Sequence, residues 1–312
     1  MSQPVLSLAN ARLLKQLHEL GPGVSPGPRY QRLSFSSDSQ WLVSVDEGVR
    51  LRWWKLSERD GFPTGSLPLQ AGSAAVVLPG AGRVLLGTYG SALQEWSISD
   101  GALLRERGSM GLSGLFLGPD GRTLLVTRDD GTIGLWDMEQ WRWVREFEKS
   151  PLQLYPGTLS PDGKLAVAGM GNLYSDPRVA LCVWDVATGA IVREVAMPSS
   201  CVACVAFHPS EPLLVAGTHT SDIHVVDTTR WQVVRQMESW GTSNMSFSPS
   251  GELLVAGERG FSVLDSHSGA SLYAHSGESD ERGSDAVFSP DGRFIAWGQD
   301  DGTVGLWGVE AG

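Results

Sequence analysis

Short runs of apolar and β-branched residues recur along the whole chain, and polar turn residues separate them. Gly, Pro, Asp and Ser gather between the runs, as they do where short strands meet tight turns. The pattern predicts an all-β chain built from short strands. The runs comprise residues 41–45, 84–88, 123–127, 165–168, 213–216, 253–256 and 294–297.

A turn element precedes each of the seven runs, which makes the chain a repeat protein. Successive elements begin about 39 to 48 residues apart, close to the ~40–45 residues of a four-stranded propeller blade and longer than helical repeats of ~33–34 residues. Pro, Asp and Gly suit a tight turn between the first two strands of such a blade. The elements are Phe35-Ser36-Ser37-Asp38, Leu78-Pro79-Gly80-Ala81, Leu117-Gly118-Pro119-Asp120, Leu159-Ser160-Pro161-Asp162, Phe207-His208-Pro209-Ser210, Phe247-Ser248-Pro249-Ser250 and Phe288-Ser289-Pro290-Asp291.

A second recurrent position, most often Trp, lies at the end of the third expected strand of each blade. A large apolar residue suits the slot between neighbouring blades, where aromatic area contributes most. In the fourth repeat this position comes later than in the others, which indicates an insertion around residues 170–178. The seven residues are Trp54, Trp96, Trp136, Trp184, Val226, Leu264 and Trp307.

Outer strands with an apolar-apolar-basic-polar pattern follow at residues 102–106, 143–146, 191–194 and 233–236. The seventh repeat has no such strand, whereas residues 12–17 carry the pattern. We expect this N-terminal strand to pair with the last blade and close the ring, because closure removes exposed sheet edges. The predicted fold is a seven-bladed β-propeller of four-stranded antiparallel blades, with residues 1–312 as one domain.

The chain resembles the WD40-repeat family over essentially its whole length. Trp136-Asp137 and Trp184-Asp185 match the signature dipeptide of the family, and Val226-Asp227 and Leu264-Asp265 are degenerate forms of it. With the strands of a blade lettered a to d, the resemblance implies that partners bind on the face that carries the d–a and b–c loops.

The repeats also depart from the family pattern. They lack the Gly-His dipeptide before strand a and the full Asp-His-Ser-Trp hydrogen-bonded set. We therefore expect the second and sixth repeats, residues 78–108 and 247–277, to rely on apolar packing alone. The Asp-box of sialidase-like propellers has one residue between Asp and Gly. It fits this chain poorly, because Asp and Gly are adjacent in these turns.

Charge and the N-terminal segment bear on partners and location. The 312 residues include 35 Asp and Glu against 24 Lys and Arg, a formal net charge of −11. Nucleic acid is not expected as a partner, because a polyanion usually binds a surplus of Lys and Arg. No stretch of about 18 apolar residues predicts a membrane span, and the first residues lack the core of a secretory signal. We expect a cytoplasmic protein that binds neither nucleic acid nor membrane.

Two groups of residues suggest metal chemistry, and both have a plainer interpretation. Cys201 and Cys204 lie three apart in an expected strand, so they point to opposite faces and are interpreted as packing thiols. His219 and His224 flank Asp222 around a predicted b–c turn. We interpret them as surface histidines, because a metal site needs a further ligand and an ordered surrounding shell.

The remaining candidate chemistry is also interpreted as structural. Acidic pairs at residues 46–47, 129–130 and 300–301 recur at one place in different blades and are expected to be solvated turn acids. The tryptophans at 41, 141, 143, 231 and 297 are better explained by packing than by an aromatic ligand box. Nucleotide-binding, nucleophile-elbow and metalloprotease motifs are absent from the sequence. We expect no catalytic residue, no metal and no cofactor.

These observations predict a non-catalytic protein–protein interaction platform, or an adaptor subunit of a larger assembly. The alternative is a propeller enzyme, a hydrolase or lyase, or a protein that binds a small ligand in the central channel. Large aromatic or Arg residues that depart from the repeat in loops are the best partner-binding candidates. They are expected on one face, with the insertion at Leu173 and Tyr174 foremost. The candidates are Tyr30, Tyr89, Arg128, Leu173, Tyr174, Arg178, His219, Trp240 and Arg259.

Overall fold

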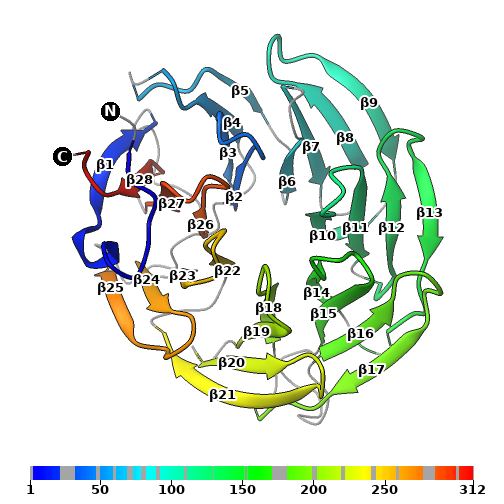
Figure 1. The fold of residues 1–312 in the computed structure, drawn as a ribbon. Coiled ribbons are helices and arrows are strands. Elements are labelled where there is room, and N and C mark those ends of the chain that lie inside the picture. The colour runs from blue at the N-terminus through cyan, green and yellow to red at the C-terminus, as the bar shows by residue number, and fades with distance from the viewer. Residues whose placement is uncertain are drawn as a thin grey trace. The chain divides into compact units, whose positions relative to one another are not determined.

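The chain has the predicted fold class, an all-β seven-bladed β-propeller of four-stranded antiparallel sheets (Figure 1). In the described ranges the one helical element is a single 3-10 turn, η1 (Ala11–Leu13). The computed structural model describes residues 3–21, 32–46, 50–58, 61–68, 73–78, 82–88, 92–108, 111–128, 130–150, 152, 154–170, 181–198, 202–218, 222–239, 244–257, 260–276, 285–299 and 302–311.

Consecutive strands pair in chain order within each of the first six sheets. The first sheet holds β2 (Arg32–Phe35), β3 (Trp41–Asp46), β4 (Arg50–Lys55) and β5 (Gly65–Pro68). The second holds β6 (Ser73–Leu78), β7 (Arg83–Thr88), β8 (Ala92–Ser97) and β9 (Leu103–Gly108). The third holds β10 (Leu112–Leu117), β11 (Thr123–Arg128), β12 (Ile133–Asp137) and β13 (Arg142–Glu146).

The remaining sheets follow the same plan. The fourth holds β14 (Leu154–Leu159), β15 (Leu165–Met170), β16 (Leu181–Asp185) and β17 (Ile191–Val195). The fifth holds β18 (Val202–Phe207), β19 (Leu213–Thr218), β20 (Asp222–Asp227) and β21 (Gln232–Glu238). The sixth holds β22 (Asn244–Phe247), β23 (Leu253–Gly257), β24 (Gly260–Asp265) and β25 (Ser271–Ser276). The seventh holds β26 (Ala286–Phe288), β27 (Ile295–Gly298), β28 (Val304–Gly308) and β1 (Lys15–Leu20).

The chain groups into two compact units, each with its own apolar core. The first comprises Met1–Leu86, Gln94–Glu106 and Ser239–Gly312, and therefore contains the first, sixth and seventh sheets and most of the second. The other comprises Gly87–Leu93 and Arg107–Glu238, and contains the third, fourth and fifth sheets. That residues 1–312 form a single domain stays a prediction.

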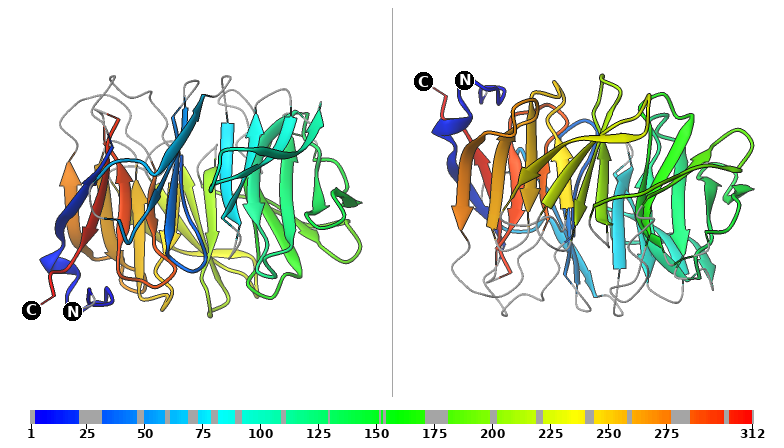
Figure 2. Two further views of the ribbon diagram at one scale, coloured as in Figure 1. Left: turned by 90° about the horizontal axis from the view of Figure 1, so that it is seen from above. Right: turned by 90° about the horizontal axis from the view of Figure 1, so that it is seen from below.

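The N-terminal strand completes the seventh sheet, as the sequence predicted. β1 pairs antiparallel with β28 from Lys15 opposite Gly308 to Leu20 opposite Val304, and Figure 2 shows both chain ends beside this pair. The strand begins later than expected because residues 11–13 form η1 instead. Ala11 and Leu14 are buried in the apolar cluster of the sixth and seventh sheets, so this turn fixes the entry into β1.

Apolar clusters lie between neighbouring sheets inside each unit. In the second unit, Leu125 and Ile133 of the third sheet share a buried cluster with Trp184 of the fourth. In the first unit, Val43 and Trp53 of the first sheet contact residues of the second. These contacts bury both faces of a sheet, which explains why the strands are continuous apolar runs rather than alternating ones.

Trp54, Trp184 and Trp307, at the end of strand c, lie in buried clusters shared by two sheets, as predicted. The side chains of Trp54, Trp136 and Trp184 are among the largest fully buried ones in the described residues. Nε1 of Trp184 donates a hydrogen bond to the backbone oxygen of Glu148, at 2.8 Å, and so connects the fourth sheet to the residues that follow β13. The Trp therefore supplies both buried area and a polar connection to its neighbour.

A hydrogen-bonded side chain stabilises the a–b turns that the structure describes, those of every sheet but the second. Oγ of Ser160 donates to Oδ1 of Asp162, at 2.7 Å, and accepts from the backbone N–H of Leu165, at 2.9 Å. Ser36 with Asp38 and Ser289 with Asp291 repeat the arrangement. This contact is the physical reason that Ser and Asp recur two residues apart in these turns.

Other side chains provide the same turn contacts in turns that lack the Ser–Asp pair. In the third sheet Oγ1 of Thr123 contacts Asp120 at 3.0 Å, and a Cβ at Gly118 would lie 2.5 Å from that Oγ1. In the fifth sheet Nδ1 of His208 accepts the backbone N–H of Glu211, at 2.9 Å. The turn geometry persists while the residue types change.

We predict that Trp184→Ala lowers the free energy of unfolding by about 3–5 kcal/mol, because it leaves a cavity between two sheets. Trp184→Phe keeps most of the area and loses the hydrogen bond to Glu148, so it should cost about 1–2 kcal/mol. Equilibrium urea denaturation of both variants measures the difference. Equal losses in the two variants would contradict a packing role for the indole.

Candidate interaction surface

One of the nine predicted partner-binding residues, Arg128, lies in the described structure. The other eight are outside the described residues. They are Tyr30, Tyr89, Leu173, Tyr174, Arg178, His219, Trp240 and Arg259.

Arg128 lies at the end of β11, where the chain leaves strand b. Its backbone N–H donates to the oxygen of Thr132, at 2.8 Å. The guanidinium lies over the ring of Trp143, at 5.8 Å from the centroid, and 4.0 Å from a carboxylate oxygen of Glu146. Both partners belong to β13, and 24% of the Arg128 side chain stays exposed. The cation is therefore held in place and still reaches solvent, as a partner contact requires.

Acidic residues near the b–c connections stabilise their own turns. Oδ1 of Asp130 accepts the backbone N–H of Thr132, at 2.9 Å. Burial alone would raise the pKa of Asp130, but the hydrogen bonds from Thr132 outweigh it and hold the pKa below its ordinary value. This agrees with the interpretation of Asp130 as a turn acid. Glu47, Asp129, Asp300 and Asp301 lie outside the described residues.

The aspartates that end strand c are likewise engaged in turn contacts. Oδ1 of Asp185 accepts the backbone N–H of Thr188, at 2.7 Å, and its hydroxyl, at 2.8 Å. The hydrogen bond from the Thr188 side chain is the main reason that the pKa of Asp185 is lowered. Asp137 and Asp227 accept the amides of their turns in the same way. These carboxylates act as turn acceptors for the c–d connection.

The interpretation of His224 as a surface histidine is wrong. His224 lies within β20 and its side chain is fully buried, because consecutive residues of strand c face one sheet or the other rather than water. Burial lowers its pKa and therefore favours the neutral imidazole. The carboxylate of Asp222, at the start of the same strand, accepts a hydrogen bond from Gln236 at 2.9 Å. His219 is outside the described residues.

No metal-binding cluster of His, Cys, Asp and Glu occurs among the described residues. Cys204 is buried in β18, whereas Cys201 lies outside the described ranges. Cys182 is also buried, and desolvation raises the pKa of its thiol to about 12. Within the same described part of the chain, no helix is long and apolar enough to cross a membrane.

A buried carboxylate in the second sheet is a feature that the sequence analysis missed. The side chain of Glu95 in β8 is 1% exposed and forms ion pairs with Arg83 of β7 and Arg105 of β9. The second repeat therefore does not rely on apolar packing alone, contrary to expectation. The sequence carried a signal for this pair, because Glu95 stands at a strand-c position that is apolar in other sheets. Leu135 and Val183 occupy that position in the third and fourth sheets, opposite Arg145 and Arg193.

The sixth repeat also uses polar contacts. Ser266 is buried, and its hydroxyl donates to the backbone oxygen of Gly251, at 2.6 Å. Asp265 accepts the backbone N–H of His267, at 2.8 Å, in the following turn. The expectation of apolar packing alone is therefore wrong here too, because a small hydroxyl hydrogen-bonds a backbone carbonyl and a carboxylate accepts from a turn amide.

Comparison with known families adds to this picture. A family model described as "WD domain, G-beta repeat" matches residues 191–227, which run from β17 through β20. The matched stretch covers one strand-d, a, b, c unit of a pattern that the structure repeats in seven sheets. The chain is a seven-bladed β-propeller that contains a WD40 repeat.

Several named proteins share sequence with this WD40-repeat chain. "Telomerase protein component 1" from Rattus norvegicus is 25% identical over 253 residues, which cover 78% of this chain and 9% of that protein. The protein of the same name from Mus musculus is 27% identical over 137 residues, or 43% of this chain and 5% of that protein. "WD repeat-containing protein SL1-17" from Schistosoma mansoni is 24% identical over 189 residues, or 59% of this chain and 60% of that protein. The chain thus spans less than two thirds of each of these relatives.

We predict that Glu95→Gln lowers the free energy of unfolding more than Glu95→Leu does. Gln leaves two arginines facing a buried neutral amide, which should cost about 1–3 kcal/mol, moderated by the partial exposure of both guanidinium groups. Leu copies the apolar residue found in other blades and should stay within about 1 kcal/mol of wild type. Urea denaturation at neutral pH compares the two. A larger loss for Leu would show that the charge itself is needed.

We also predict an acid-dependent contribution from Asp185. Its folded pKa lies below the ordinary value of 3.8, so the carboxylate stabilises the fold above that value, and the contribution disappears as the pH falls through the folded pKa. The stability advantage of wild type over Asp185→Asn should therefore be present at neutral pH and shrink below about pH 3.8. Urea titrations at several pH values measure it. An advantage that is independent of pH would refute the charged hydrogen bond.

Proposed function

We propose that this chain is a non-catalytic protein–protein interaction platform and works as an adaptor subunit of a larger assembly. The WD40-repeat fold is typical of interaction scaffolds, which supports the class of function. The name of its mammalian relatives describes a component of telomerase, and a component of an assembly is consistent with this class. Because the chain covers 9% of the rat protein, neither that assembly nor its partners are transferred to this chain.

The observation that carries the proposal is the contrast between strands of similar length and b–c connections of unequal length. Residues 171–180 connect β15 to β16, whereas residues 129–132 and 219–221 make the same connection in the adjoining sheets. Strand pairing sets the frame and leaves these connections free to vary in length. Loops on a rigid scaffold are where partner contacts concentrate. Of these three connections, the one in the fourth repeat, where the insertion is predicted, is the longest.

Arg128 favours the same face. It lies at the end of a b strand, next to the connection at residues 129–132, and Trp143 and Glu146 orient its guanidinium. A guanidinium that is already ordered loses less side-chain entropy when it binds a carboxylate or a backbone oxygen. Together with the insertion in the next sheet, this supports partner binding at the d–a and b–c loops. A cytoplasmic location and the absence of nucleic-acid and membrane partners stay predictions.

We predict that the double variant Tyr174→Ala and Arg128→Ala loses at least about tenfold in partner affinity, a change worth about 1.4 kcal/mol. Stability should fall by no more than about 1 kcal/mol, since the Arg128 side chain is partly exposed and its contacts include a cation–π contact and a weak ion pair. Quantitative affinity capture from an extract of the source organism, followed by mass spectrometry and titration of the recovered partner, measures the affinity.

The matched control is Arg122→Ala with Lys164→Ala. Arg122 precedes β11 at the strand end opposite Arg128, and Lys164 precedes β15 in the same way; both side chains are well exposed. The control should bind the partner like wild type. Equal losses in both double variants would refute the assignment of the face. A purified protein that captures no protein but retains a small molecule would refute the platform itself.

A further inference from the structure

Three charged side chains lie together in the second sheet, one on each of β7, β8 and β9. The buried carboxylate of Glu95 contacts both arginines. Nη1 of Arg83 pairs with one carboxylate oxygen, and Nε of Arg105 donates to the other, at 2.5 Å. All three residues belong to the first unit, and we call them the Arg–Glu–Arg cluster. A single carboxylate thus connects three neighbouring strands of one sheet.

The cluster departs from the repeat at two positions at once. Glu95 replaces an apolar strand-c residue, and Arg83 replaces an uncharged residue at the start of strand b. The corresponding strand-c residues are Trp53, Leu135, Val183, Val225, Val263 and Leu306, and strand b of the first, third, fourth, fifth and sixth sheets begins at Trp41, Thr123, Leu165, Leu213 and Leu253. Such sheets therefore form without these two charges, and a buried carboxylate costs desolvation free energy that an apolar residue avoids. A departure that the fold does not require points to a use outside the fold.

The two guanidinium groups carry more charge than the carboxylate neutralises. Glu95 is 1% exposed, whereas 40% of the Arg83 side chain and 33% of the Arg105 side chain are exposed. Arg83 forms no other ion pair with a residue that the structure describes. Glu106 follows Arg105 in β9, so its side chain points to the opposite face of the sheet. The cluster therefore has one positive charge in excess, and its cations are the groups that reach solvent.

The pairing with Glu95 indicates which ligand the exposed side of the cluster suits. A guanidinium presents five N–H donors in a planar fork that matches a carboxylate, and Arg83 uses Nη1 on Glu95. One further carboxylate brings a single negative charge, which matches the single positive charge in excess. Because Glu95 already orders both guanidinium groups, a ligand that binds them costs less side-chain entropy. The cluster therefore favours a second carboxylate, bound through charge-assisted hydrogen bonds.

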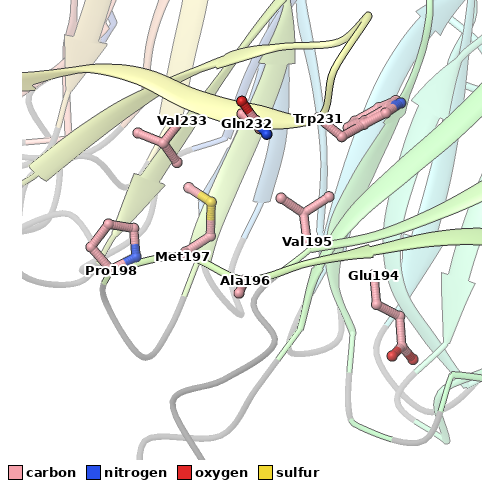
Figure 3. A pocket seen from close by; sticks show the side chains of 8 residues that line it. All are labelled: Glu194, Val195, Ala196, Met197, Pro198, Trp231, Gln232 and Val233. Atoms are coloured by element: carbon pink, nitrogen blue, oxygen red, sulfur yellow. The ribbon is translucent and has the colours of Figure 1, made fainter.

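A groove between the outer strands of the fourth and fifth sheets lacks this selectivity. It has a volume of about 600 Å³, and its described lining residues, 194–198 and 231–233, include no Lys or Arg (Figure 3). Figure 3 shows the carboxylate of Glu194 directed away from Trp231. Trp231 itself packs against the buried cluster of the two sheets. Charge therefore selects a ligand at the Arg–Glu–Arg cluster and not at this groove.

We propose that Arg83 and Arg105 bind a carboxylate group from outside the chain and that Glu95 positions both guanidinium groups for it. The carboxylate comes either from an acidic side chain of a protein partner or from a free carboxylic acid, and the two sources present the same group. The site goes beyond the proposed function. Strand b begins at the a–b turn, so Arg83 lies at the strand end away from the b–c loops.

The test uses the full chain labelled with ¹⁵N at arginine and a capped tripeptide in which aspartate stands between two glycines. At constant ionic strength the peptide should shift the Nε signals of Arg83 and Arg105 saturably, and asparagine in place of aspartate should weaken binding at least about tenfold. Acetate distinguishes the sources, since binding as tight as that of the peptide indicates a free carboxylate and weaker binding indicates an acidic residue of a protein. Unchanged Nε signals at millimolar peptide, equal binding of the asparagine peptide, or tighter binding of a phosphoserine peptide would overturn the proposal.

Two variants and one matched control assign the site, with binding followed at the Nε signal of Arg105. Arg83→Leu should weaken binding of the aspartate peptide about tenfold and still fold, because leucine begins strand b in three other sheets. Arg83→Lys keeps the charge and loses the planar fork, so it should weaken binding several-fold. Arg122→Leu removes an exposed arginine, paired with Glu139, just before strand b of the third sheet, and should bind like wild type. Equal weakening by Arg122→Leu, or none by Arg83→Leu, would show that the carboxylate binds elsewhere. Neither result bears on the loop-face capture.

Discussion

The stacking of sheet faces within each unit is the constraint on which the rest of the structure depends. A four-stranded sheet of this kind has two apolar faces and cannot bury either one alone. In the fourth sheet, Ala166 and Trp184 pack toward the third sheet, whereas Val167 and Val183 pack toward the fifth. Successive residues of strands b and c therefore all need to be apolar. The free energy gained by this burial, about 25 cal/mol per Å², is what makes an unbroken apolar run the basic unit of the sequence.

The turns impose a second, looser constraint. Each a–b turn needs an acceptor for the amides that its curvature leaves without strand partners, but several side chains can provide one. Ser160 with Asp162, Thr123 with Asp120, and His208 alone all do so. Because the requirement is for a polar atom at a position and not for one residue type, the repeats can diverge widely while the sheets persist. This explains why the turn residues vary in sequence while the turn hydrogen bonds persist in the turns that the structure describes.

The fold could be predicted from the sequence because its main signals are local and repeated. Period, turn chemistry and the strand-c Trp each recur, and even the closing strand carries the outer-strand pattern. The errors concern contacts that a local pattern does not encode. The sequence predicts His224 beside a b–c turn and therefore at the surface, whereas it lies inside strand c, where its side chain is buried. Glu95 meets Arg83 and Arg105 only through strand pairing. Among the candidate site residues, Arg128 alone could be compared with the described structure, where Trp143 and Glu146 hold it in position.

Departures from the repeat that bury a charge or strain the backbone are compensated by contacts inside the chain. At Glu95 a charge replaces the apolar residue of other blades, and two arginines from adjacent strands neutralise it, so the departure is compensated inside its own sheet. Trp141 is compensated likewise by Trp136. Trp231 bears the same unfavourable backbone conformation and packs against the buried apolar cluster of the fourth and fifth sheets. Since strain in a fold persists only where something offsets it, each of these departures persists because contacts inside the chain compensate it.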